Sequence, residues 1–166
     1  MKKLALAAIL ILTGCNNSSK KNIDFTFFKW NIHESYYLKF NSSDTLYYID
    51  VYGFKKETCF TILNKDEKDK IQNMLDTITF PKIDSYESQV EDGETNAFVL
   101  KDENQIRKLK IHGANGPILF RFFGKSLDNI KINHKFTKTN KKIDLEEINK
   151  IVIMKVPPTF VIDTLQ

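Results

Sequence analysis

The sequence lacks most of the motifs that mark an enzyme or a metal site. It has three histidines in 166 residues. His33, His112 and His134 are too far apart for the paired spacing of a metal-binding helix. No serine stands in a Gly-x-Ser-x-Gly elbow, and no glycine-rich phosphate loop occurs. The usual signatures of metal binding, acyl transfer and nucleotide hydrolysis are therefore missing, and we predict neither a metal nor a cofactor.

Arginine is equally scarce. The chain has 25 Lys and Arg against 21 Asp and Glu, but only Arg107 and Arg121 are arginines. Two of the lysines, Lys2 and Lys3, belong to the leader described next, so the excess of positive charge is small. Phosphate and base recognition favours the bidentate fork of arginine. Composition therefore argues against a nucleic-acid partner.

No apolar run in the chain is long enough to span a bilayer, which needs about 20 residues. The nine-residue run Leu4 to Leu12 follows two lysines and precedes two small residues, Thr13 and Gly14. A positive start, a short apolar run and a small-residue site have the layout of a cleavable export signal. The next residue is Cys15.

Leu12-Thr13-Gly14-Cys15 resembles the lipobox of bacterial lipoprotein precursors, and this resemblance covers about the first fifteen residues. It implies cleavage after Gly14, a diacylglyceryl thioether on Cys15 and acylation of the new amino group. Two or three acyl chains would anchor the protein stably in a membrane. Asn16, where some bacteria use Asp to retain lipoproteins, favours the outer membrane with the domain facing the periplasm. The alternative is an ordinary signal peptide followed by a chance cysteine.

These boundaries predict a signal peptide over 1–14, a lipidated flexible tether over 15–22 and one α+β domain over 23–166. Removal of 14 of the 166 residues would leave 152, which is enough for a stable hydrophobic core without disulfide bonds or bound metal. With Cys15 lipidated, Cys59 is the only thiol left, which excludes an internal disulfide and a cysteine-based zinc site. Cys59 lies in an alternating apolar stretch that is typical of a buried, inert thiol.

The fold expected for the domain is antiparallel hairpins packed against two helices, as a loose β-β-α repeat. In the first half, alternation predicts strands at Ile23 to Phe27, Tyr36 to Phe40, Thr45 to Val51 and Cys59 to Leu63. Asn64 with Glu67 forms a capping-box pattern. The helix that follows places Ile71, Met74, Leu75 and Ile78 on one face, and it should end before Pro81.

The second half repeats this plan. A hairpin is expected from Thr95 to Leu100 and Gln105 to Ile111, then a helix from Pro117 with one apolar face. That face would hold Leu119, Phe123, Leu127 and Ile130. A buried strand over Ile118 to Phe123 is the alternative. The apolar run Ile151 to Met154 is expected to be a central strand.

Tyrosines crowd the first hairpin, and half of them must point away from the core by strand alternation. Tyr47, Tyr48 and Tyr52 are therefore candidate binding residues for an exposed aromatic face. Tyrosine also suits strands for purely local reasons. Both interpretations remain open at this stage.

A second candidate is a positive face before the loop Gly113 to Gly116. Lys108, Lys110 and His112 alternate along the preceding strand, and Asn115 lies in the loop. If the loop opens a helix, its free N–H groups could hold an anion. A plain connecting turn is the alternative.

Two charged segments complete the candidates. The acidic loop Asp84 to Glu94 has clustered carboxylates but lacks the ligand spacing of a calcium loop. The segment Lys125 to Lys142 is basic and could lie against anionic lipid, or could be a solvated loop.

We therefore expect a lipid-anchored, non-enzymatic binding or interaction module of the cell envelope, attached to the membrane through Cys15, with an unknown ligand or protein partner. The alternative is a small envelope hydrolase whose site is assembled only in three dimensions. A pocket holding two carboxylates, or His with a carboxylate, would favour the hydrolase. A broad exposed aromatic face would favour the binding module.

Overall fold

The computed structural model describes residues 23–52, 56–89, 93–102 and 105–152. The predicted signal peptide, Cys15 and the tether lie outside these residues. The elements in chain order are β1 (Asp24–Trp30), β2 (Ser35–Phe40), β3 (Thr45–Asp50), β4 (Glu57–Ile62), α1 (Lys65–Thr77), β5 (Ser85–Glu87), β6 (Thr95–Lys101), β7 (Ile106–His112), α2 (Ile118–Asn133), β8 (Thr137–Lys138) and α3 (Glu146–Val152).

One sheet of eight strands organises the domain, in the order β5-β7-β6-β1-β2-β3-β4-β8. Every neighbouring pair is antiparallel except β5 and β7, which are parallel. The first half is a four-stranded meander followed by α1, and the second is the hairpin of β6 and β7 followed by α2. The first strands of these two units, β1 and β6, pair near the centre of the sheet. The α+β class and the hairpin-then-helix repeat are confirmed.

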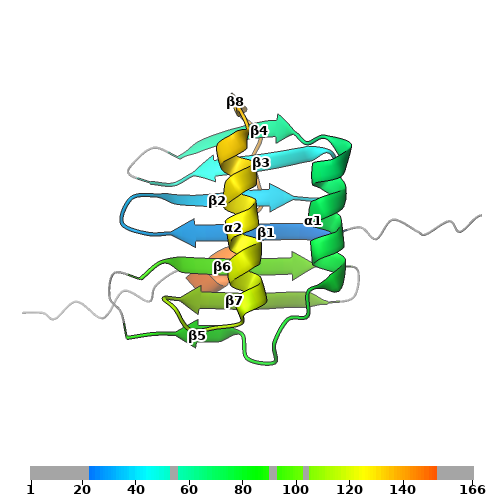
Figure 1. Cartoon of the computed structure of the whole chain (residues 1–166). Helices are drawn as coiled ribbons and strands as arrows, with labels where there is room; N and C mark the ends of the chain where they lie inside the picture. Colours follow the sequence, from blue (N-terminus) through cyan, green and yellow to red (C-terminus); the bar gives the residue numbers. More distant parts are fainter. Residues whose placement is uncertain (1–22, 53–55, 90–92, 103–104, 153–166) are drawn as a thin grey trace, which may run out of the picture.

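Both faces of the sheet are covered. Helices α1 and α2 cross the strands on one face, and α3 lies behind the sheet (Figure 1). Phe25 and Phe27 of β1 pack in the core under α1 and α2, whereas Phe28 packs in a second core with Leu145 and Ile148. A central strand covered on both sides must bury consecutive residues, which is why β1 reads DFTFFKW without a polar alternation.

Helix α1 begins as predicted. The side chain of Asn64 accepts a hydrogen bond from the Glu67 N–H, and the Glu67 carboxylate accepts one from the Asn64 N–H. Ile71 and Leu75 are buried in the first core. The helix ends at Thr77, before Pro81, in agreement with the prediction.

Helix α2 forms where the second helix was expected, so the alternative of a strand over Ile118 to Phe123 is wrong. Phe123 and Leu127 are buried as predicted, but Leu119 is 66% exposed and Phe120 is buried in its place. Ile130 also packs against the core as predicted, so only Leu119 of the predicted face is wrong. Helix α2 carries eight large apolar side chains, so more than one set of them could face the sheet.

The third helix corrects the prediction for the tail. Ile151 and Val152, expected in a central strand, belong to helix α3; residues 153 and 154 lie outside the described chain. Leu145, Ile148 and Ile151 recur at every third position and face the second core. That spacing is helical, and the four-residue apolar run concealed it.

Phe98 provides a test of the packing between the sheet and α2. It is fully buried and its ring contacts those of Phe27, Phe120 and Phe123. We expect Phe98→Ala to lower the free energy of unfolding by about 3–5 kcal/mol, because the cavity cannot collapse among rigid rings. Chemical denaturation measures the change. Ile62→Ala, at a 60% exposed position, is the control and should change stability by less than about 0.5 kcal/mol.

Candidate functional site

Four side chains meet in one row across the end of the sheet. Trp30 of β1 pairs with Thr95 of β6, Thr95 pairs with His112 of β7, and His112 pairs with Glu87 of β5. Residues that pair directly across neighbouring strands project to the same face. Two antiparallel pairings and one parallel pairing thus bring together residues that are more than eighty positions apart in the chain. We call this row the pocket row.

The next row of the same face leaves room for a cavity. Phe28 pairs with Ala97, and Ala97 pairs with Lys110. Ala97 is fully buried in the second core, and Phe28 and Lys110 on either side of it both line a cavity. Helix α3 lies over part of this face, and its Val152 lines the cavity.

The result is a pocket of about 420 Å³. Its lining residues are Phe28, Trp30, Glu87, Thr95, Lys110, His112 and Val152. One wall is apolar and aromatic, and the other is polar and charged. Such a division could orient an amphipathic molecule, as polar groups do in small-molecule sites that are otherwise apolar.

Hydrogen bonds hold the polar wall in place. The Thr95 hydroxyl lies 2.8 Å from Nδ1 of His112, and the Lys110 ammonium donates to Glu87 at 3.0 Å. The hydrogen bond from Lys110 and its positive charge lower the pKa of Glu87. Glu87 therefore remains an anion beside the two basic side chains of the wall.

Gly113 closes this end of β7. Its φ of +74° is one that residues with a side chain rarely adopt, and a Cβ there would lie 1.8 Å from Oγ of Ser88. Ser88 donates to the His112 carbonyl from both its N–H and its hydroxyl, each at 3.1 Å. The glycine thus lets β5 approach β7 closely enough to place Glu87 beside His112.

The structure separates the residues of the predicted positive face. Lys110 and His112 line the pocket, whereas Lys108 forms an ion pair with Glu147 of α3 at 2.7 Å. Asn115 is exposed in the loop after β7. Helix α2 begins at this loop without a side-chain cap. The positive charge therefore faces α3 and the pocket, and not the loop that was expected to hold an anion.

The three candidate tyrosines do not share one exposed surface. Tyr47 is buried towards α3, and its hydroxyl accepts a hydrogen bond from Lys141 at 2.6 Å. Tyr48 packs against the core under the helices on the other face. Only Tyr52 is exposed, and its hydroxyl donates to the carbonyl of Ile32. The expectation of outward tyrosines assumed a sheet with one free face, but here both faces are covered.

The two charged segments are also divided by the fold. Glu87 lies at the pocket and Glu94 on the opposite face, while Glu91 and Asp92 are outside the described residues. Among the residues that the structure describes, no group of three or more His, Cys, Asp or Glu is placed to hold a metal ion. In the basic segment, Lys131 and Lys138 pair with Glu34 and Glu57, so this segment does not present one continuous basic face.

A second hollow lies beside this segment on the α3 face. It measures about 470 Å³ and is lined by Ile49, Lys56, Thr58, Thr139, Asn140, Lys141, Lys142, Ile143 and Leu145. Its lysines are exposed to solvent. None of these lining residues is aromatic, a histidine or a carboxylate, so this hollow offers fewer groups for recognising a specific small molecule.

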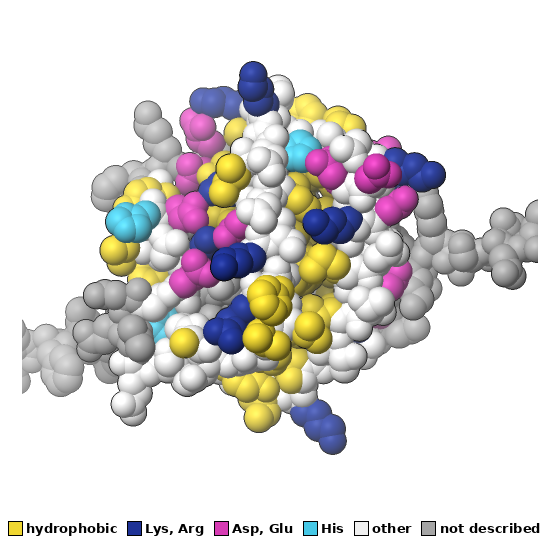
Figure 2. All heavy atoms as spheres, viewed as in Figure 1, with side chains coloured by type: hydrophobic (Ala, Val, Ile, Leu, Met, Phe, Trp, Pro, Cys, Tyr) yellow, Lys and Arg dark blue, Asp and Glu magenta, His cyan; other side chains and the backbone are white. Residues whose placement is uncertain are grey.

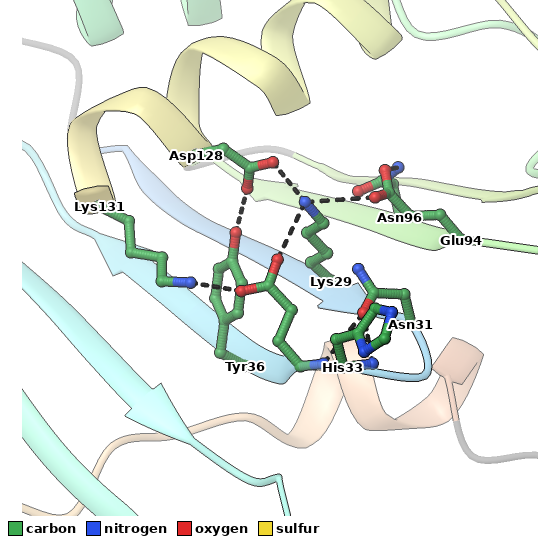
Figure 3. Close-up of polar contacts among 9 residues, drawn as sticks. Lys29, Asn31, His33, Tyr36, Glu94, Asn96, Asp128 and Lys131 are labelled. Atoms are coloured by element: carbon green, nitrogen blue, oxygen red, sulfur yellow. Dashed lines mark hydrogen bonds and ion pairs between the residues drawn. The ribbon is translucent and has the colours of Figure 1, made fainter.

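A buried charged cluster lies on the opposite face of the same sheet end (Figure 3). Lys29 of β1 is 9% exposed at its side chain, and its ammonium lies 2.5 Å from Asp128 and 3.2 Å from both Glu34 and Glu94. A lysine has three N–H donors, and here three carboxylates surround them. Asp128 comes from α2, so the cluster joins this helix to the strands beneath it.

Two more side chains complete the charged cluster. The Tyr36 hydroxyl donates to Asp128. The Lys131 ammonium lies 2.5 Å from Glu34 and 4.2 Å from the centre of the Tyr36 ring. The cluster therefore consists of Lys29, Glu34, Tyr36, Glu94, Asp128 and Lys131, with three acids and two bases.

The electrostatics of the charged cluster favour a structural role. Burial by itself would lower the pKa of Lys29, but the hydrogen bond to Asp128 and the surrounding carboxylates raise it overall. Burial and the hydrogen bond to Asp128 raise the pKa of Tyr36. A lysine or tyrosine that acts as a base or nucleophile needs the opposite shift, towards neutral pH. The cluster thus holds its protons and clamps α2 to the sheet.

Sequence reasoning missed the charged cluster, and of the pocket row it had singled out His112 and placed Glu87 in the acidic loop, without bringing the two together. Lys29 follows Phe27 and Phe28 directly in a strand, and a lysine within an apolar strand run is an available signal that a partner is needed. No comparable signal marks Trp30, Thr95 and Glu87. Their meeting depends on which strands pair, and on the parallel addition of β5 to the edge.

Comparison with known proteins gives no identification: no family model and no curated protein matches the chain. Within the described residues, no helix is both long enough and apolar enough to cross a membrane.

The charged cluster predicts a specific acid sensitivity. Burial opposes ionisation of Glu34, but hydrogen bonds from Lys131 and Lys29 lower its pKa overall. Its stabilising effect is therefore present above its ordinary value of 4.5 and is lost as the pH falls through the folded value. We expect Glu34→Gln to be less stable than the parent at pH 7, with a difference that shrinks towards pH 3. Urea unfolding across this range tests it, and a difference independent of pH would contradict it.

Proposed function

We propose that the protein is a lipid-anchored binding module of the cell envelope that holds a small amphipathic ligand in the pocket at the end of β1, β6, β7 and β5. One observation carries the ligand site: a single row of paired residues supplies both a tryptophan wall and a histidine with a carboxylate. The lipobox-like segment ending at Cys15 supports the anchor, with the domain facing the periplasm.

The lining defines the chemistry of the ligand. Phe28, Trp30 and Val152 offer an apolar wall against which a flat ring or a short hydrocarbon can pack. Lys110 and His112 offer donors to a carboxylate, sulfonate or phosphate group on the other side. A molecule that carries a ring and an acidic group close together fits both walls.

A second function, hydrolysis, is favoured by one specific observation. His112 contacts the Thr95 hydroxyl at 2.8 Å, and Glu87 follows on the same row, as a hydroxyl, a base and an acid would in nucleophilic catalysis. Against this, Thr95 is almost fully buried, and Glu87 is bound by Lys110. Binding without turnover therefore accounts better for the arrangement.

The anchor leads to a direct prediction. Cys15→Ser should abolish incorporation of a labelled fatty acid and leave an uncleaved or mislocalised precursor, because serine provides no thiol for the diacylglyceryl transfer. Metabolic labelling followed by fractionation measures both. Ser18→Ala, three residues further along the proposed tether, is the control and should be labelled normally. Labelling of the Cys15→Ser protein would show that the anchor is absent or lies elsewhere.

The pocket can be tested with anilinonaphthalene sulfonate, a probe that has a flat ring system and an acidic group. Trp30 is the only tryptophan of the chain, so bound probe should quench its fluorescence by energy transfer. We expect Lys110→Met and His112→Phe each to weaken binding about tenfold, since each removes the donor of a hydrogen bond to a charged group, worth about 1.5 kcal/mol.

Ile62→Ser is the matched control, because it changes an exposed apolar residue far from the pocket and should leave probe binding unchanged. Equal affinity in the pocket variants and the parent would place the probe elsewhere and contradict the site. Turnover of a nitrophenyl ester that Thr95→Val abolishes would instead assign hydrolysis to this pocket.

A further inference from the structure

The outward face of α2 carries bulky apolar side chains that the fold does not cover. Ile118, Leu119, Phe122 and Ile132 are between 55% and 72% exposed. Hydrophobic side chains gather over the lower part of this helix in the space-filling view, with Lys and Arg beside them (Figure 2). Single exposed apolar residues are common, but a group of them on one helix marks an interaction site.

The charges of this face all have one sign. Arg121 and Lys125 are exposed between the apolar residues. The only acidic residue of α2 is Asp128, which is turned towards the sheet and bound to Lys29 and Tyr36. The α2 outer face, defined as Ile118, Leu119, Arg121, Phe122, Lys125 and Ile132, is therefore apolar and basic without a compensating acid.

We propose that the α2 outer face lies against an anionic lipid surface. A helix with Phe, Leu and Ile beside Lys and Arg binds in the plane of the interface, through apolar burial together with attraction to acidic head groups. The helix need not cross the membrane to do so. The whole domain would then rest on the membrane with α2 beneath the sheet.

Two other occupants fit less well. A second copy of the chain in a two-fold dimer would set this basic face against the same basic face of the partner copy, which like-charge repulsion disfavours. The chain beyond Val152 starts from the opposite face of the sheet, where Val152 lines the pocket. The basic charge of the α2 outer face thus selects an acidic surface over both.

The geometry also suits the anchor proposed above. Ile23 belongs to the core under α1 and α2, and the eight steps from Cys15 to Ile23 span at most about 28 Å. An acylated Cys15 would therefore keep the domain close to the lipid. This docking does not require the acyl chain, so it can be tested without it.

The test uses a chain that starts at residue 15 with Cys15→Ser, which retains the whole described fold and carries no lipid. It is sedimented with vesicles of equal phosphatidylglycerol and phosphatidylcholine, and with vesicles of phosphatidylcholine alone. We expect binding to the anionic vesicles only, weakened as salt rises. Arg121→Gln with Lys125→Gln should weaken it about thirtyfold, and Leu119→Ser with Phe122→Ser should remove it.

Ile62→Ser, an equally exposed apolar position on the other face, is the control and should bind as the parent does. Melting temperatures establish that the variants fold. If the change of Leu119 and Phe122 destabilises the domain, the variant with Arg121 and Lys125 changed decides the test.

No binding of the parent to anionic vesicles would overturn the proposal, as would binding that is unaffected by changing Arg121 and Lys125. A dimer in sedimentation that the Leu119 and Phe122 changes dissociate would overturn it in favour of self-association. A variant of the α2 outer face that loses vesicle binding but still binds anilinonaphthalene sulfonate in the pocket would show that the two sites act independently, so each proposal can fail without the other.

Discussion

The register between β1 and β6 is the constraint on which the other features depend. Lys29 pairs with Asn96, and Trp30 pairs with Thr95. A slip of one residue would exchange the two faces of β1. Lys29 would then point towards α3, away from its carboxylates, and Trp30 would point into the core beneath α2. The pocket and the charged cluster therefore lie back to back at one sheet end, and one register specifies both.

The charged cluster makes that register costly to change. A buried lysine is strongly unfavourable without partners, and only one face offers Glu34, Glu94 and Asp128. Such a cluster adds little stability compared with apolar packing, but removing one of its charged partners strongly destabilises the fold. We infer that it specifies the position of α2 on the sheet. The same helix then presents its outer face at a fixed angle, which a surface-binding role requires.

Local patterns predicted the parts of the fold that depend on neighbouring residues. The capping box at Asn64 defined the start of α1, and alternation located the strands of both hairpins. The prediction was wrong where tertiary packing decides. Leu119 and Phe120 are equally apolar, and the sheet selects Phe120; the run at Ile151 and Val152 suits a strand or a helix, and packing in the second core favours the helix.

The candidate site was predictable only in part for the same reason. Alternation placed Lys110 and His112 on one face of their strand, and both line the pocket. Trp30 and Glu87 reach it through pairings between distant strands, which no local pattern encodes. The tyrosines show the converse: their local pattern suggested an exposed face, but the covering of both sides of the sheet buried Tyr47.

The most direct test of the pocket is nuclear magnetic resonance of the isotope-labelled domain during titration with 2-naphthoate, a ring with one carboxylate. We expect shifts concentrated at the Trp30 indole and at the amides of Thr95, Ala97, Lys110 and His112, with α1 and α2 unchanged. Shifts centred on the helices, or none at millimolar ligand, would contradict a binding pocket at this end of the sheet.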